Sequence, residues 1–106
     1  MTKEAKRMLY VLYKEYLLRR KRGETISHAK KFCDAQSIQE SFFPDWYLED
    51  VEEVLRELGR CGYLANFYAD NTVYACSLKD STIAMFENMP HDIFENVTDF
   101  IAKFIP

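Results

Sequence analysis

The stretch from Tyr47 to Leu78 constrains the fold more than any other part of the chain. In its first half, apolar side chains recur every three or four residues and so share one face of a helix. These positions are Leu48, Val51, Leu55 and Leu58. Acidic and basic residues fill the positions between them, as on the wet side of an amphipathic helix. Gly59 and Gly62 follow, and one of them is expected to provide a left-handed helix cap.

The second half of this stretch predicts two strands. Residues 63–68 and 72–78 are rich in aromatic and β-branched side chains. The segment Ala69-Asp70-Asn71 separates them, and Asp and Asn tolerate positive φ angles in tight turns. We therefore expect a helix that leads directly into a β-hairpin.

Length and composition indicate one folded domain. A chain of 106 residues has room for a single core of modest size, and an apolar content of 48% excludes a disordered chain. Only three glycines and three prolines occur, which favours long helices over a strand-rich sandwich. No apolar run approaches the ~20 residues of a membrane span, and the charged first residues lack the apolar core of a secretion signal. We expect a soluble, cytoplasmic protein.

The three cysteines, Cys33, Cys61 and Cys76, lack the spacing of a metal site. We expect reduced, partly buried thiols that pack as small apolar groups. His28 has no partner ligands at a useful spacing either, so no metal is expected.

Charge is distributed very unevenly along the chain. Residues 1–31 carry ten basic and three acidic side chains, whereas residues 32–106 carry four basic and fourteen acidic ones. The net charge of −3 therefore combines a basic first part with an acidic remainder. This split suggests either a nucleic-acid contact or a self-complementary assembly.

The apolar spacing of the first part predicts a helix from about Lys3 to Lys21. It ends in the run Arg19-Arg20-Lys21-Arg22, followed by Gly23. A basic helix end complements the helix dipole, but four consecutive bases also fit a phosphate clamp. Both interpretations remain open at this point.

A short second helix is expected from about Ile26 to Ala35, capped by Thr25 or Ser27. Its inner face would be Ala29, Phe32 and Cys33. Residues 36–46 lose the helical period and predict an irregular connection. Its aromatic side chains, Phe42, Phe43 and Trp46, are expected to pack into the core.

Two further helices should follow the hairpin. The first starts within Lys79-Asp80-Ser81, with Asp80 or Ser81 as its cap, and ends at Met89-Pro90, because proline disfavours helix in the residue before it. The second is an amphipathic helix over residues 91–105. Its apolar face either packs on the first helix of the same chain or forms the seam of a homodimer, and we expect the dimer. The seam residues would be Ile93, Phe94, Val97, Phe100, Ile101 and Phe104.

The segment Tyr47–Leu78, with Gly62-Tyr63-Leu64 at the entry to the hairpin, resembles the small bacterial and phage-type winged helix-turn-helix proteins. The resemblance covers about residues 5–89. It implies an α+β, mostly helical fold in which residues 1–106 form a single winged helix-turn-helix domain, with three helices, a β-hairpin wing and additional C-terminal helices. One departure is Lys79, where the group often has a helix-capping Thr; the cap would move to Asp80.

The resemblance also implies a nucleic-acid interface. The helix from Leu48 to Gly59 would enter the major groove, and the Asp70-Asn71 tip would lie along phosphates. The exposed acids of that helix and a tip without Lys or Arg oppose this, because they repel the phosphate backbone. Double-stranded DNA would then have to be bound mainly by the basic side chains of the first two helices, with Gln36, Gln39 or Arg56 reaching base edges. The candidate DNA-binding residues are Arg19, Arg20, Lys21, Arg22, Lys30, Lys31, Gln36, Gln39, Arg56 and Arg60.

The expected function is a small DNA-binding protein that regulates transcription. The alternative is a winged-helix adaptor that binds protein and no DNA, with the basic end of one molecule meeting the acidic helix of another. No enzyme is expected, because no phosphate loop or catalytic triad is recognisable. Glu52 and Glu53 point in different directions on one helix, so they are read as a solvated face. No cofactor is implied.

Overall fold

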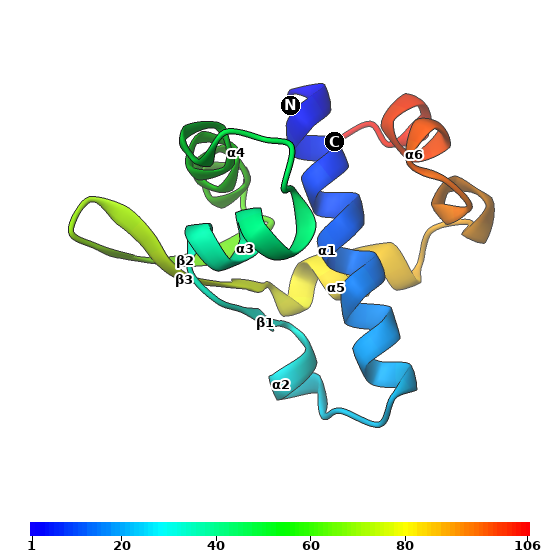
Figure 1. Cartoon of the computed structure of the whole chain (residues 1–106). Helices are drawn as coiled ribbons and strands as arrows, with labels where there is room; N and C mark the ends of the chain where they lie inside the picture. Colours follow the sequence, from blue (N-terminus) through cyan, green and yellow to red (C-terminus); the bar gives the residue numbers. More distant parts are fainter.

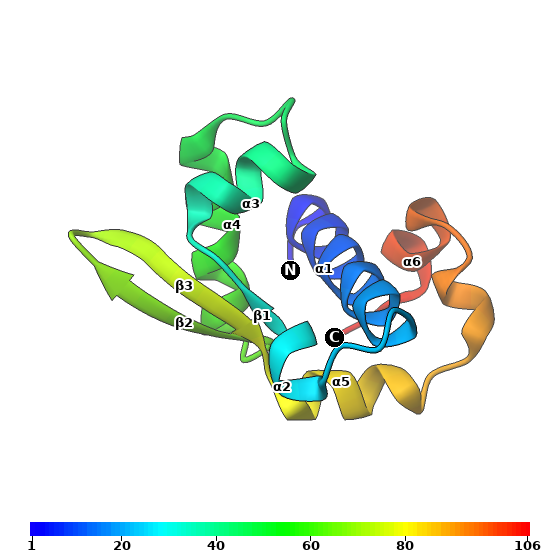
Figure 2. The same ribbon diagram turned by 60° about the horizontal axis from the view of Figure 1, so that its bottom comes forward.

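The computed structural model describes all residues, 1–106, as an α+β fold of helices and one small antiparallel sheet (Figure 1). The first helix, α1 (Lys3–Lys21), runs through the middle of the molecule. The sheet and helices α3 (Ala35–Phe42) and α4 (Leu48–Arg60) lie on one side of it and α6 (Val97–Lys103) lies on the other, while α5 (Asp80–Glu87) passes from the sheet across α1 (Figures 1 and 2). In chain order the elements are α1 (Lys3–Lys21), α2 (Ile26–Ala29), β1 (Lys31–Phe32), α3 (Ala35–Phe42), α4 (Leu48–Arg60), β2 (Leu64–Ala69), β3 (Thr72–Leu78), α5 (Asp80–Glu87), the 3-10 helix η1 (His91–Phe94) and α6 (Val97–Lys103).

Helix α1 has the bounds that the sequence predicts. The Thr2 hydroxyl caps it by accepting a hydrogen bond from the backbone N–H of Ala5 at 3.1 Å. At its other end Gly23 adopts a φ of 93°, which ends the helix in the left-handed region. Its inner face is buried along the helix, through Ala5, Met8, Leu9, Leu12, Tyr13 and Tyr16.

The passage from α4 into the hairpin is confirmed. Gly62, with a φ of 86°, provides the left-handed cap of α4. The N–H of Tyr63 donates to the carbonyl of Leu58 at 3.0 Å and that of Gly62 to Gly59 at 3.1 Å, which is the bond pattern of a Schellman cap. One predicted apolar position is wrong: Leu48 is 43% exposed, and Val54 is buried instead.

The hairpin closes at the predicted turn. Asp70 and Asn71 have φ angles of 52° and 61°, as a two-residue type I′ turn requires. Strands β2 and β3 pair antiparallel, with a bulge between Phe67 and Tyr68, and β1 pairs on the other side of β3, so the strand order is β1-β3-β2. The hairpin projects away from α1 in both views (Figures 1 and 2).

The segment between α1 and α4 differs from the prediction. The second helix ends at Ala29, and β1 follows where the helix was expected to continue. Residues 35–42 form helix α3 where an irregular connection was expected, because the Asp34 carboxylate accepts a hydrogen bond from the N–H of Ser37 and caps this helix. The aromatic residues of this segment do pack on the core as predicted, with Phe43 buried and Phe42 and Trp46 partly buried.

The C-terminal part also differs. Residues 91–105 do not form one helix, since η1 and α6 are separated at Asn96, whose side chain accepts a hydrogen bond from the N–H of Asp99 and starts α6. Lys79, not Asp80, is the N-cap residue of α5, and it makes no side-chain cap bond.

The predicted dimer seam is occupied by the chain itself. Four of the six predicted seam residues, Ile93, Phe94, Phe100 and Phe104, are at most 8% exposed, and α6 packs on α1. The other two, Val97 and Ile101, are partly exposed. Their aromatic rings lie against one another and against α1 and α5; the Phe86 and Phe100 ring centroids, for example, are 5.7 Å apart. Of the two arrangements considered from the sequence, the structure therefore shows the one in which this apolar face packs on the first helix of the same chain.

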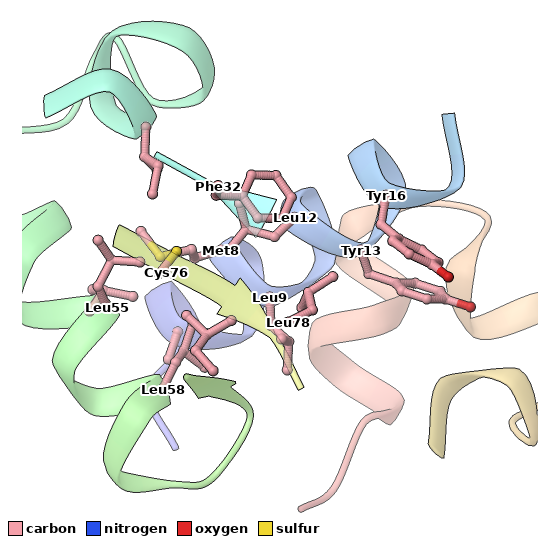
Figure 3. Close-up of a cluster of buried hydrophobic side chains, with 14 of the residues drawn as sticks. Met8, Leu9, Leu12, Tyr13, Tyr16, Phe32, Leu55, Leu58, Cys76 and Leu78 are labelled. Atoms are coloured by element: carbon pink, nitrogen blue, oxygen red, sulfur yellow. The ribbon is translucent and has the colours of Figure 1, made fainter. Parts of the chain in front are cut away.

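The core joins both sides of α1. Side chains from α1, α4 and β3 meet in one cluster (Figure 3). Cys76 belongs to this cluster, whereas Cys33 and Cys61 are exposed, contrary to the expectation that all three thiols are partly buried. Burial raises the pKa of the Cys76 thiol to about 12. None of the helices combines the length and the apolar character that a membrane crossing needs.

Candidate functional site

The first residue of the basic run, Arg19, is a structural residue. Its guanidinium donates hydrogen bonds to the backbone carbonyls of Ala29 at 3.3 Å and Lys31 at 2.7 Å. It also pairs with Glu15 at 2.8 Å and lies 4.6 Å from the centroid of the Phe32 ring. Arg19 thus fixes α2 and β1 to the end of α1, and its charge is largely used within the chain.

The other predicted basic residues differ in whether a carboxylate neutralises their charge. Arg22 lies within 3.5 Å of two carboxylates, and Lys30 pairs with Asp80 at 2.8 Å. Arg20, Lys21 and Lys31 are exposed and have no carboxylate oxygen within 4.0 Å. We call Arg20, Lys21, Arg22 and Lys31 the basic end of the molecule.

Arg56, predicted to reach DNA bases, instead holds the hairpin to α4. Its guanidinium donates to the carbonyl of Asn71 at 2.7 Å and lies 5.0 Å from the centroid of the Tyr68 ring. Glu52, one turn earlier, accepts the N–H of Val73 with both oxygens at 3.1 Å and pairs with Arg56 at 3.6 Å. Glu52 is therefore a structural acid, and the prediction that it belongs to a solvated face is wrong.

The glutamines and the last arginine are spread over separate places. The Gln39 amide donates to the backbone carbonyls of Phe43, Pro44 and Trp46, so it shapes the turn between α3 and α4. Gln36 bonds to Glu40 on the surface of α3, and Arg60 lies 3.9 Å from Glu53 at the end of α4.

The ten predicted DNA-binding residues consequently do not form one face. Those at the basic end lie where α1 finishes, whereas α4 lies beside the start of α1 (Figure 1). Helix α1 has 19 residues. At a rise of 1.5 Å per residue its ends are about 28 Å apart.

A groove of about 480 Å³ lies between the start of α1 and the outer side of α4. Its lining combines aromatic and apolar side chains with carboxylates, and we call it the α4 groove. The lining residues are Thr2, Glu4, Asp45, Trp46, Tyr47, Asp50, Glu53, Val54 and Glu57.

The carboxylates of the α4 groove have almost no cationic partners. Among its five acids only Glu53 has a base within 4.0 Å, and that contact, with Arg60 at 3.9 Å, joins two exposed side chains. Glu57 accepts hydrogen bonds from the N–H and the hydroxyl of Thr2, at 2.8 and 2.7 Å, without a charged partner. The groove therefore has a concentrated negative charge that the chain itself does not neutralise.

Local structure explains why this charge is tolerated. Glu4 lies in the first turn of α1 and Asp50 in the first turn of α4, where each helix dipole favours an anion. The aromatic part is fixed in place: the Trp46 ring packs on Phe43 with centroids 4.5 Å apart, and Gln39 binds the backbone of the same turn. Tyr47 is 80% exposed at the rim.

The sequence predicted an acidic outer face for α4 but not a groove. The residues missed are Glu4, Asp45, Trp46, Tyr47 and Asp50, because the groove forms only where α1 packs against α4 and Thr2 binds Glu57. An aromatic pair directly before an acidic helix is the signal that could have pointed to it.

The remaining polar groups show no metal-binding arrangement: no group of three or more His, Cys, Asp or Glu could hold an ion. The hydrogen bond between His28 and Glu24 lowers the pKa of the Glu24 carboxyl at the surface. Comparison of the chain with protein-family models, with curated proteins and with solved structures finds no match.

Proposed function

We propose that this protein is a winged helix-turn-helix module that binds a basic segment of another protein in the α4 groove. The observation that carries the proposal is that the partly buried Trp46 and the exposed Tyr47 line one hollow together with five carboxylates, of which only Glu53 has a cationic partner. This favours the adaptor function over DNA binding by α4.

The strand order and helix order support the winged helix-turn-helix assignment. Helix α3 precedes α4, and β1 pairs with β3, the second strand of the hairpin. The hairpin is the wing in this interpretation. Helix α3, not α2, then takes the position of the first helix of the helix-turn-helix. This fold carries many functions, so the groove and not the fold is the basis for the proposed function.

Two features of α4 argue against its use as a DNA-reading helix. Glu49, Asp50 and Glu53 are exposed on α4, and each acid near a phosphate backbone weakens the electrostatic attraction that dominates DNA affinity. In addition, Arg56 is engaged with Asn71 and Tyr68 of the hairpin. A guanidinium held in this way has to break those contacts before it can reach a base.

The groove has the chemistry for lysine and arginine side chains. Carboxylates accept charge-assisted hydrogen bonds from guanidinium and ammonium groups. The aromatic faces of Trp46 and Tyr47 add cation–π contacts, worth about 0.5–1 kcal/mol at exposed sites. Because Trp46 is the only tryptophan of the chain, it also reports directly on binding.

A fluorescence titration tests the proposal. Adding a short arginine- and lysine-rich peptide at about 0.01 M salt should change the Trp46 emission until the change saturates. At about 0.15 M salt the change should be much weaker, because the Debye length falls from about 30 to about 8 Å. An acidic peptide of the same length should have no effect.

Variants identify the surface. Asp50→Asn with Glu53→Gln should weaken peptide binding at least tenfold, whereas Glu95→Gln with Glu87→Gln, which changes net charge equally outside the groove, should leave it unchanged. Equal binding by all three proteins would contradict the proposed site, and absence of binding at low salt would contradict the proposed function.

DNA binding by the basic end is the second candidate, and with it transcriptional regulation. The observation that favours it is the absence of a carboxylate partner at Arg20, Lys21 and Lys31. In an electrophoretic titration with mixed-sequence duplex DNA, this candidate requires binding that weakens steeply with salt and that Arg20→Glu with Lys21→Glu abolishes. No binding at low salt removes it.

A further inference from the structure

The chain itself contains the kind of segment that the α4 groove is suited to bind. At the basic end, Arg20 and Lys21 are exposed at the last turn of α1 without carboxylate partners. The Arg20 guanidinium donates to the carbonyl of Glu24 at 2.8 Å, which orients it without neutralising it. Two unneutralised surfaces of opposite charge therefore occur on one molecule.

These two surfaces cannot meet within one molecule. Thr2 and Glu4 of the α4 groove lie at the start of α1, and Arg20 and Lys21 lie at its end, about 28 Å away along a straight helix. This separation is several times the Debye length of about 8 Å at physiological salt. Each surface can be neutralised only from outside the molecule.

We propose that a second copy of this chain is the occupant of the α4 groove, bound through its basic end. This inference rests on the proposed function and names its partner. The aliphatic stems of Arg20 and Lys21 of the incoming copy lie along Trp46 and Tyr47, and their charged ends pair with Asp50 and Glu53.

The contact is head-to-tail, since the two surfaces that meet are different. Each copy keeps a free groove at one end and a free basic end at the other, so the contact repeats. The expected assemblies are open chains or closed rings whose size grows with concentration, in contrast to a two-fold dimer. The apolar face of η1 and α6 is buried within each copy and does not contribute to these assemblies.

Sedimentation velocity of the full chain tests this inference. At about 0.01 M salt the weight-average mass should rise steadily with protein concentration, and at about 0.15 M salt the rise should be much weaker, because screening shortens the range of the attraction. Association driven by the exposed aromatic residues of the hairpin would instead persist at high salt.

Charge reversal provides the decisive comparison. Two double variants should each be monomeric at low salt. One is Arg20→Glu with Lys21→Glu, and the other is Asp50→Lys with Glu53→Lys. An equal mixture of the two double variants should associate again, since each reversed surface then finds its complement on the other variant. The control is Lys79→Glu with Lys103→Glu, which changes net charge like the first variant but outside both surfaces and should associate like the wild type. Circular dichroism verifies that each variant is folded.

Three results would overturn this inference. The wild-type protein could stay monomeric at low salt, both double variants could still associate on their own, or the mixture of the two variants could fail to associate. The peptide titration separates the two levels of the proposal. A monomeric protein whose Trp46 still responds to the basic peptide leaves the proposed function standing without self-association. A monomeric protein with no response contradicts both.

Discussion

Replacing Phe100 by alanine tests whether the C-terminal apolar face is part of the core of the chain. Phe100 is 0% exposed, and its ring centroid lies 4.9 to 5.7 Å from those of Tyr10, Phe86, Phe94 and Phe104. A buried Phe→Ala change loses the transfer free energy of the ring and leaves a cavity, at a cost of about 3–5 kcal/mol. Since the free energy of unfolding of a small domain is about 5–15 kcal/mol, this is a large fraction of its stability.

Urea unfolding followed by far-ultraviolet circular dichroism measures this loss. With a slope of about 2 kcal/mol per molar urea, the midpoint should fall by about 1.5–2.5 M. The control is Ile105→Ala on the same terminal segment: Ile105 is 82% exposed, and its loss should change the stability by no more than about 0.5 kcal/mol. A loss below about 1 kcal/mol for Phe100→Ala, together with a change from dimer to monomer, would refute the packing described above and favour the dimer seam.

Three further changes follow from other contacts. Gly59→Ala should destabilise the protein by about 1–3 kcal/mol in thermal unfolding, despite the better helix propensity of alanine. The added Cβ would lie 2.6 Å from the Asn66 Nδ2 atom, which is hydrogen-bonded to the carbonyl of Leu55. An increase in stability would contradict this close approach. Asp34→Ala should cost about 1 kcal/mol at neutral pH, because α3 loses its cap. The hydrogen bonds from Ser37 lower the pKa of the Asp34 carboxyl, so this stabilisation is complete above pH ~3.9 and is lost as the pH falls through the lower folded-state value; a difference between wild type and variant that persists at lower pH would contradict it. A thiol-alkylating reagent near neutral pH should modify two cysteines of the native protein quickly and Cys76 only after unfolding, as mass spectrometry can count; three fast reactions would contradict its burial.

The sequence predicts the elements whose signals are local. Helix α1, helix α4 with its Gly62 cap, and the Asp70-Asn71 turn each depend on periodicity or on turn residues within a few positions. The bounds of these elements agree with the structure to within two residues.

The errors arise where a short polar side chain interrupts a longer pattern. Asp34 lies within the helix predicted from Ile26 to Ala35 and caps α3, which was expected to be an irregular connection, and Asn96 divides the single helix predicted over residues 91–105. Strand β1 has only two residues and exists because β3 provides its hydrogen-bonding partner. Such a strand carries no periodic signal of its own.

The candidate site could be predicted only in part for a similar reason. The acidic face of α4 can be read from spacing, but the groove beside it depends on the packing of α1 against α4 and on the contact of Thr2, the N-cap residue of α1, with Glu57. Likewise the contacts that occupy Arg19, Gln39 and Arg56 are made with backbone carbonyls, which composition and charge patterns do not reveal.

Chemical-shift mapping on the isotopically labelled protein tests the central claim, that α4 presents a surface for basic protein segments and not for DNA. The basic peptide and duplex DNA would be added in separate titrations at low salt. With the peptide, the shifted backbone amides should fall within residues 45–57 and around Thr2. With DNA, any shifts should be confined to the basic end. DNA-induced shifts along the outer face of α4, with no response of these amides to the peptide, would contradict the account.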